Sequence, residues 1–303
     1  MSDCRKVPHN TTIFFFIAVA VVCGSLAVSA GICRAAEADF TARELADQTL
    51  KASGEGITDD TLAAYRNLLS LGDDFESRKI QAEIAWKLLY RAGNVDQLKR
   101  AEIIYRAARK LGDEEDIRIS QSRASKAIMC AYILAKRPDD AADVLHSMEK
   151  LGAGPEVRAQ RAEAIATFMR YTVTNGGAAA TLPWYKAVNT LGTEPAEVVR
   201  ARLQAAKLMQ LAWTFESNAK GVGQVYYDME AIGSDLNIRL RRMDAAGIAV
   251  LSYASSENPE KAMSVYESTG LLGEEPEIRQ QRERIKKSME YMKQMMKGVP
   301  SQE

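Results

Sequence analysis

The chain contains few of the residues that usually carry catalysis or bind metals. Its 303 residues include four cysteines and two histidines. Cys4, Cys23 and Cys33 lie in an N-terminal segment with the features of an export signal, so a mature chain would keep Cys130 and His146 alone. One cysteine allows no intrachain disulfide. One histidine argues against a zinc site and against a nucleophile–histidine pair. We therefore expect no enzymatic activity, no cofactor and no metal.

The chain also lacks an excess of charge of either sign. Lysine and arginine total 40, aspartate and glutamate total 40, and the net charge is zero. This balance argues against nucleic acid as the main partner, because nucleic-acid-binding domains usually carry a strong basic excess. The glycine-rich stretch over residues 175–180 lacks the lysine and hydroxyl residue of a phosphate-binding loop. We expect it to be a long turn between helices.

A long hydrophobic run occurs only near the N-terminus. Arg5 and Lys6 precede an apolar run over residues 13–30, and Ala36-Glu37-Ala38 is a small-x-small cleavage site, with residues 28–30 as a second candidate. These features predict a signal peptide over residues 1–38. An uncleaved anchor is the alternative, because residues 13–33 are long enough to span a bilayer. Both interpretations place the rest of the chain in the periplasm or otherwise outside the cytoplasm, with inner-membrane anchoring in the second.

The most regular feature of the sequence is a set of glycines, here called the marker glycines, spaced by 40, 40, 40, 41 and 40 residues. They are Gly72, Gly112, Gly152, Gly192, Gly233 and Gly273. The residues seven before them are Tyr65, Tyr105, Leu145, Tyr185, Tyr226 and Tyr266. A fixed period of this size indicates stacked supersecondary units. The small, tyrosine and apolar residues that precede each glycine are three, four or seven residues apart, so they share one face of a short helix. Glycine adopts the left-handed conformation that can end such a helix.

A longer helix, of about 18 residues by its apolar pattern, is predicted after each marker glycine. Each block of 40 residues is therefore expected to be one short and one long helix. Residues 39–53 form a first helix, and the polar helix starting at Glu275 covers the open end of the stack. The predicted fold is an all-α solenoid of about six helix pairs with a C-terminal capping helix. Residues 39–297 form this domain, and residues 298–303 form a flexible tail.

A family resemblance is clearest in Ala101, Tyr105, Ala108 and Leu111. Two other units support it, with Ala262 and Tyr266 and with Ala141 and Leu145. This spacing resembles the second helix of the tetratricopeptide repeat. The period is 40 residues here against about 34 in that family, and the tryptophan signature of its first helix is missing. Pentatricopeptide and Sel1-type arrays stay open as relatives. The resemblance implies a right-handed superhelix whose longer helices line a concave groove, and a role in holding proteins or peptides.

An arginine ladder is the first candidate binding feature. Six residues after the marker glycine stand Arg78, Arg118, Arg158, Arg239 and Arg279. The fourth unit has Val198 instead, with Arg200 and Arg202 nearby. Three units add an arginine three residues further on: Arg161, Arg242 and Arg282. We hypothesise a basic strip in the groove that grips carboxylates, since arginine forks suit such groups. The alternative is that each arginine bridges to the adjacent unit or is solvated.

Aromatic residues give the second candidate feature. The repeated tyrosines are expected to pack in the core, whereas Trp184 and Tyr227 occupy positions that the repeat does not require. We hypothesise that these two rings are exposed in the groove, where aromatic side chains anchor peptides. Cys130 is expected to be a small buried residue, with a reactive thiol or an intermolecular bridge as the alternatives. The predicted function is a non-enzymatic scaffold in the bacterial cell envelope that binds another protein or a peptide. The alternatives are a structural subunit of an envelope or secretion assembly, and an accessory protein of a cell-wall enzyme.

Overall fold

The structure is a computed structural model that describes residues 41–54, 56–92, 95–256 and 258–298. The expected signal peptide or anchor, residues 39–40 of the first helix and residues 299–303 of the tail lie outside the described residues. Among the helices that are described, none is both long enough and apolar enough to cross a membrane.

The all-α prediction is confirmed, because the described part of the chain contains helices and no strands. The short helices are α2 (Asp59–Leu69), α4 (Leu98–Ala108), α6 (Pro138–Met148), α8 (Gly177–Asn189), α10 (Ala219–Asp228) and α12 (Pro259–Ser268). The long helices are α3 (Phe75–Arg91), α5 (Glu115–Leu134), α7 (Pro155–Asn175), α9 (Ala196–Phe215), α11 (Leu236–Ser255) and α13 (Pro276–Gly298). Residues 41–52 are also helical and precede α2. Single 3-10 turns are η1 (Val95–Gln97), η2 (Glu149–Leu151), η3 (Met229–Ile232) and η4 (Thr269–Leu272).

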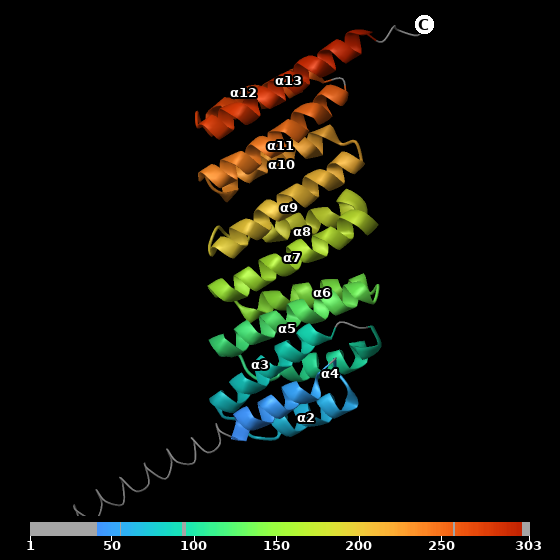
Figure 1. Ribbon diagram of the computed structural model, residues 1–303, viewed down its shortest axis with the longest axis vertical. Coiled ribbons are helices and arrows are strands. Elements are labelled where there is room, and N and C mark those ends of the chain that lie inside the picture. Colours follow the sequence, from blue (N-terminus) through green and yellow to red (C-terminus); the bar gives the residue numbers. More distant parts are fainter. Residues whose placement is uncertain (1–40, 55, 93–94, 257, 299–303) are drawn as a thin grey trace, which may run out of the picture.

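The helices are stacked in chain order along the length of the molecule (Figure 1). α3 packs on α5, α5 on α7, α7 on α9 and α11 on α13, so most of the long helices form a continuous row, here called the long-helix row. The short helices pack mainly on the long helices next to them in sequence. The handedness of the array and its family membership stay predictions.

Three of the marker glycines follow a 3-10 turn and adopt a conformation that differs from the expected left-handed helical one. Gly152 has φ 95° and ψ −170°, Gly233 has φ 152° and ψ −175°, and Gly273 has φ 120° and ψ 179°. The positive φ was expected, but the ψ angles are extended, a combination almost restricted to glycine. The reason lies in the preceding turn. The chain tightens into a 3-10 turn there and must then extend before the next long helix begins.

The long helices begin at residues suited to satisfy their free N–H groups. Asp74 accepts a hydrogen bond from the Ser77 N–H at 3.0 Å, and Asp235 accepts one from the Ile238 N–H at 3.0 Å. Pro155 occupies the first turn of α7, where the missing N–H has no helical partner to lose. The aspartate caps thus mark where α3 and α11 begin, whereas the marker glycines follow the short helices.

Three of the five repeated tyrosines are buried in the core, as expected, and the other two, Tyr105 and Tyr266, are half-buried against it. Some of them also link successive units. Tyr65 and Tyr226 are each 1% exposed. Three tyrosine hydroxyls form hydrogen bonds to a side chain of the next unit: Tyr105 to Ser147 at 3.3 Å, Tyr185 to Asp228 at 3.2 Å, and Tyr226 to Ser268 at 2.9 Å. A buried phenol needs such a partner, so the same position supplies apolar packing within a unit and a polar contact between units.

Two predictions are corrected by the structure. The stretch over residues 175–180 is not a long turn, because α7 ends at Asn175 and α8 begins at Gly177. The Glu216 carboxylate accepts a hydrogen bond from the Ala178 N–H at 2.6 Å, and negative charge at a helix N-terminus favours this early start. Cys130 is half-buried on α5 rather than buried in the core.

Candidate functional site

The ladder arginines contact the end of the short helix in the following unit. The Arg78 Nη1 donates to the Leu111 carbonyl at 2.9 Å, and the Arg239 Nη1 donates to the Leu272 carbonyl at 2.7 Å. Arg158 makes the same contact with the carbonyl 33 residues further on. Each acceptor directly precedes a marker glycine, and a cation is favourable at a helix C-terminus. The ladder therefore clamps one unit to the next.

A carboxylate completes this clamp in two units. Arg78 forms an ion pair with Glu114, and Arg239 forms one with Glu275. Main-chain hydrogen bonding to the Glu114 carboxylate is the leading cause of its lowered pKa, and the hydrogen bond from the Arg78 guanidinium lowers this pKa further. The Arg239 guanidinium is the leading cause of the lowered pKa of Glu275.

The other ladder positions differ in their contacts and in their exposure to solvent. Arg118 lies against Gly152, where a Cβ atom would be 3.2 Å from its Nη1. Arg279 is exposed on α13, and no further helix pair follows it within the described residues. Val198 is fully buried and cannot donate a hydrogen bond. The contact to the next unit is made by Arg202, one turn further along α9. Arg202 is 4% exposed and donates to the Gly192 carbonyl at 2.7 Å and to the Ala231 carbonyl at 3.3 Å.

The second set of arginines reaches back to the short helix of its own unit. Arg161 pairs with Glu149, Arg242 pairs with Glu230 at 3.3 Å, and the Arg282 guanidinium lies 5.4 Å from the Tyr266 ring centre. In the first two units glutamine occupies this position: Gln81 donates to the Leu68 carbonyl, and Gln121 donates to the Ala108 carbonyl, each at 3.0 Å. Most candidate arginines thus have intramolecular partners. Their binding of an external anion stays a prediction.

The two candidate aromatic residues lie on short helices in different surroundings. Trp184 on α8 is half-buried, with ring centres 5.1 Å from His146 and 5.0 Å from Phe168. Tyr227 on α10 is 42% exposed and tilts against Tyr226 at 4.9 Å. Trp184 therefore packs between elements, whereas Tyr227 is open to solvent. The structure does not bring the two rings together.

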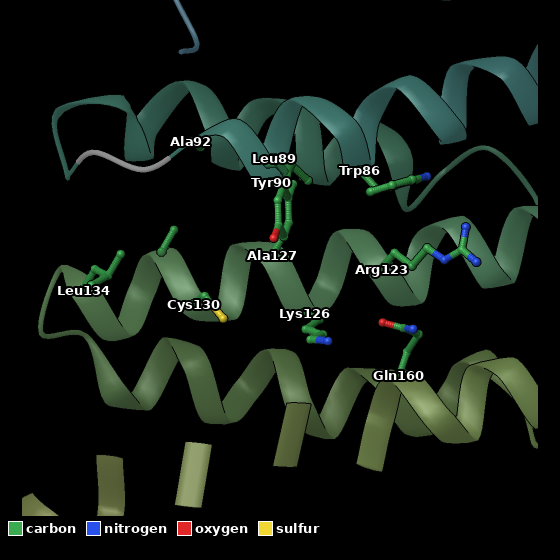
Figure 2. A pocket seen from close by; sticks show the side chains of 11 residues that line it. Trp86, Leu89, Tyr90, Ala92, Arg123, Lys126, Ala127, Cys130, Leu134 and Gln160 are labelled. Carbon is green, nitrogen blue, oxygen red and sulfur yellow. The ribbon is translucent and has the colours of Figure 1, made fainter. Parts of the chain in front are cut away.

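A groove runs across the long-helix row (Figure 2). It lies between α3, α5 and α7, and its volume is about 340 Å³. It is lined by Trp86, Leu89, Tyr90, Ala92, Arg123, Lys126, Ala127, Cys130, Ala131, Leu134 and Gln160. Pockets that bind small molecules or side chains typically range from about 300 to 1,000 Å³. This groove, here called the α3–α5–α7 groove, is at the lower end of that range.

Large apolar side chains stand at the mouth of the groove. Tyr90 is 79% exposed and Leu134 is 61% exposed. The Trp86 indole is partly buried, and its Nε1 is shielded from solvent without an acceptor among the described residues. The Arg123 guanidinium lies over the Trp86 ring, 5.4 Å from the ring centre. The groove thus combines exposed apolar surface with an unused indole donor and a stacked cation.

Cys130 lies on the groove wall with its sulfur visible between Lys126 and Leu134 (Figure 2). Burial raises the pKa of the thiol, and the nearby Lys126 charge offsets part of that rise. Because the thiolate is the reactive form, Cys130 is a weak nucleophile at neutral pH. The described residues contain no group of three or more histidine, cysteine or acidic side chains placed to hold a metal ion.

Sequence reasoning did not single out Trp86, Tyr90, Arg123 or Leu134. The sequence does contain a feature that could have identified Tyr90. Tyr90 stands 18 residues after its marker glycine, at the position occupied by Cys130 in the next unit and by Arg170 in the one after. An aromatic residue at a position that is polar or small in its neighbours indicates an outward-facing apolar side chain. The other three residues follow no rule of the repeat.

The chain matches no protein-family model, no curated protein and no solved structure. The resemblance to tetratricopeptide repeats therefore rests on the spacing of its own residues.

Proposed function

We propose that this protein is a non-enzymatic scaffold that binds a protein or peptide segment in the cell envelope, and that the α3–α5–α7 groove is where the segment docks. The observation that carries the proposal is the pair of exposed side chains at the groove mouth, Tyr90 at 79% and Leu134 at 61% exposure. Clustered apolar side chains around a hollow are typical of interaction sites, whereas scattered ones are common on any surface.

The free energy gained by covering these two side chains supports a role in binding. Covering one large apolar side chain contributes about 1.5–3 kcal/mol, so Tyr90 and Leu134 together provide a substantial part of the free energy of a micromolar complex, about −8 kcal/mol. Aromatic residues and arginine are also the residue types that most often dominate binding energy. The lining offers Trp86, Tyr90 and Arg123 within one groove.

The contacts between units favour a preformed groove. Arg78 joins α3 to the turn that precedes α5, and Lys126 on α5 pairs with Glu163 on α7. These links hold the three helices of the groove in fixed register. A rigid site loses little conformational entropy on binding, which leaves more of the contact energy for affinity.

Site-directed photo-crosslinking in the native cell tests the proposal. We expect a benzoylphenylalanine at position 90 of the full chain to give discrete adducts, and the additional change Leu134→Asp to abolish them. The matched control places the same group at Lys186, an exposed residue of short helix α8. Equal adduct patterns at positions 90 and 186, or adducts that persist with Leu134→Asp, would contradict the groove as a docking site.

A further inference from the structure

We infer that the segment bound in the α3–α5–α7 groove carries a carboxylate close to a large apolar side chain, and that Arg123 binds the carboxylate. This inference rests on the proposed function and assigns the chemistry of the partner. It concerns Arg123, which is not a member of the arginine ladder.

The charge of the groove is the first argument. The lining contains two cations, Arg123 and Lys126, and no acidic residue. Lys126 forms an ion pair with Glu163 of α7, which neutralises its charge. Arg123 makes no ion pair and no hydrogen bond to the described residues. One unneutralised cation therefore remains in the lining, and it attracts a partner of negative charge.

The geometry of the donors is the second argument. A guanidinium carries five N–H donors in a planar fork and no acceptor. The guanidinium carbon of Arg123 lies over the Trp86 ring, 5.4 Å from its centre, and this contact restrains the side chain, so that less side-chain freedom is lost when an acceptor binds. Figure 2 shows the Arg123 guanidinium and the Gln160 amide toward the same end of the groove. A carboxylate accepts from several such donors at once.

The opposite end of the groove has a different chemistry. Cys130 and Leu134 lie there, away from the Trp86 and Arg123 end, with Tyr90 between the two ends (Figure 2). This end offers no strong donor or acceptor and suits an apolar side chain. With about 340 Å³ in total, the groove accommodates one or two side chains and not a folded element. The matching ligand is a short segment with one apolar anchor and one carboxylate.

Three pools of synthetic peptides test the inference by fluorescence polarisation on the full chain. Each peptide has blocked ends, one phenylalanine or leucine, and one variable residue placed between one and four positions away. The variable residue is glutamate in the first pool, glutamine in the second and lysine in the third. We expect the glutamate pool to bind about fivefold more tightly than the glutamine pool, with the lysine pool weakest.

Arginine variants assign the effect to one side chain. We expect Arg123→Gln to make the glutamate and glutamine pools equal, and Arg123→Glu to favour the lysine pool. Arg200→Gln is the matched control, because Arg200 is exposed on α9 of the same row and belongs to neither the groove nor an ion pair among the described residues. It should leave the order of the pools unchanged. Thermal unfolding of each variant checks that the fold is retained.

The outcomes separate this inference from the proposed function. Equal affinity for the glutamate and glutamine pools, with binding still weakened by Tyr90→Ala, overturns the carboxylate and leaves the scaffold. Self-association of the chain that Tyr90→Ala abolishes assigns the groove to a second copy and overturns the inference. If no pool binds and position 90 gives no crosslink, the proposed function is wrong as well.

Discussion

The Arg78 Nη1 donates to the carbonyl of Leu111 at 2.9 Å, across a separation of 33 residues. The same relationship joins Arg158 to Leu191 and Arg239 to Leu272. Because each acceptor is the last carbonyl before a marker glycine, the arginine, the helix end and the glycine form one repeated joint. Several predictions about stability depend on this joint.

The first prediction concerns the glycine of the joint. At Gly112 φ is 129°, and a Cβ atom would lie 2.3 Å from the Arg78 Nη1. We expect Gly112→Ala to destabilise the protein by about 1–3 kcal/mol, since it strains the backbone and displaces the guanidinium. Urea unfolding measures the change. Gly54→Ala is the control, because the nearest atom to its Cβ is 3.9 Å away, and it should change stability by less than about 0.5 kcal/mol. Equal effects of the two substitutions would disprove the joint.

The second prediction concerns the arginine that replaces a missing ladder member. Arg202 is 4% exposed and donates to two carbonyls and to the Asn189 amide oxygen. We expect Arg202→Met to cost about 2 kcal/mol, because it leaves buried carbonyl groups without donors. Thermal unfolding with Arg200→Met as the exposed control provides the comparison. A variant at position 202 as stable as the wild type would show that desolvation of the buried charge offsets its hydrogen bonds.

The third prediction concerns acid stability. Main-chain hydrogen bonding together with the Arg78 guanidinium holds the pKa of Glu114 below the unfolded value of 4.5, and the Arg239 guanidinium is the leading cause of the lowered pKa of Glu275. A lowered pKa stabilises the folded state fully above pH 4.5, and this contribution is lost as the pH falls through the folded value. We expect the double variant Glu114→Gln, Glu275→Gln to be less stable than the wild type at neutral pH and to approach it in acid. A stability difference between the two proteins that does not change with pH would refute this assignment.

The fourth prediction concerns the thiol of the groove. Burial raises the pKa of Cys130 above its usual 9.0. The rate of alkylation by iodoacetamide should therefore rise with pH and reach half its maximum above pH 9.0 in the folded protein. In urea the midpoint should fall to the ordinary value. Lys126→Gln removes the charge that lowers this pKa, so the midpoint in the folded variant should move further up. A midpoint unaffected by unfolding would contradict burial as the cause.

The helix pairs were predictable because their causes are local. The spacing of the marker glycines reports where each short helix must end, and the apolar period reports which face is buried. The same logic placed Tyr65 and Tyr226 in the core, where both are 1% exposed. The start of α8 at Gly177 was missed because its stabilising acceptor, Glu216, lies 38 residues beyond Ala178, directly after α9.

The sequence by itself determined the all-α class, the unit length and the buried row of tyrosines, since each follows from the residues of one unit. Only the tertiary structure decided where the side chains of different units meet. The ladder position in the fourth unit holds Val198 instead of arginine. Arg202, four residues further along α9, donates to the Ala231 carbonyl in the next unit instead. Ala127 and Ala131 line the α3–α5–α7 groove at positions where the next unit has the larger Thr167 and Tyr171. A hollow is a property of side chains contributed by three helices at once, and no single period in the sequence records it.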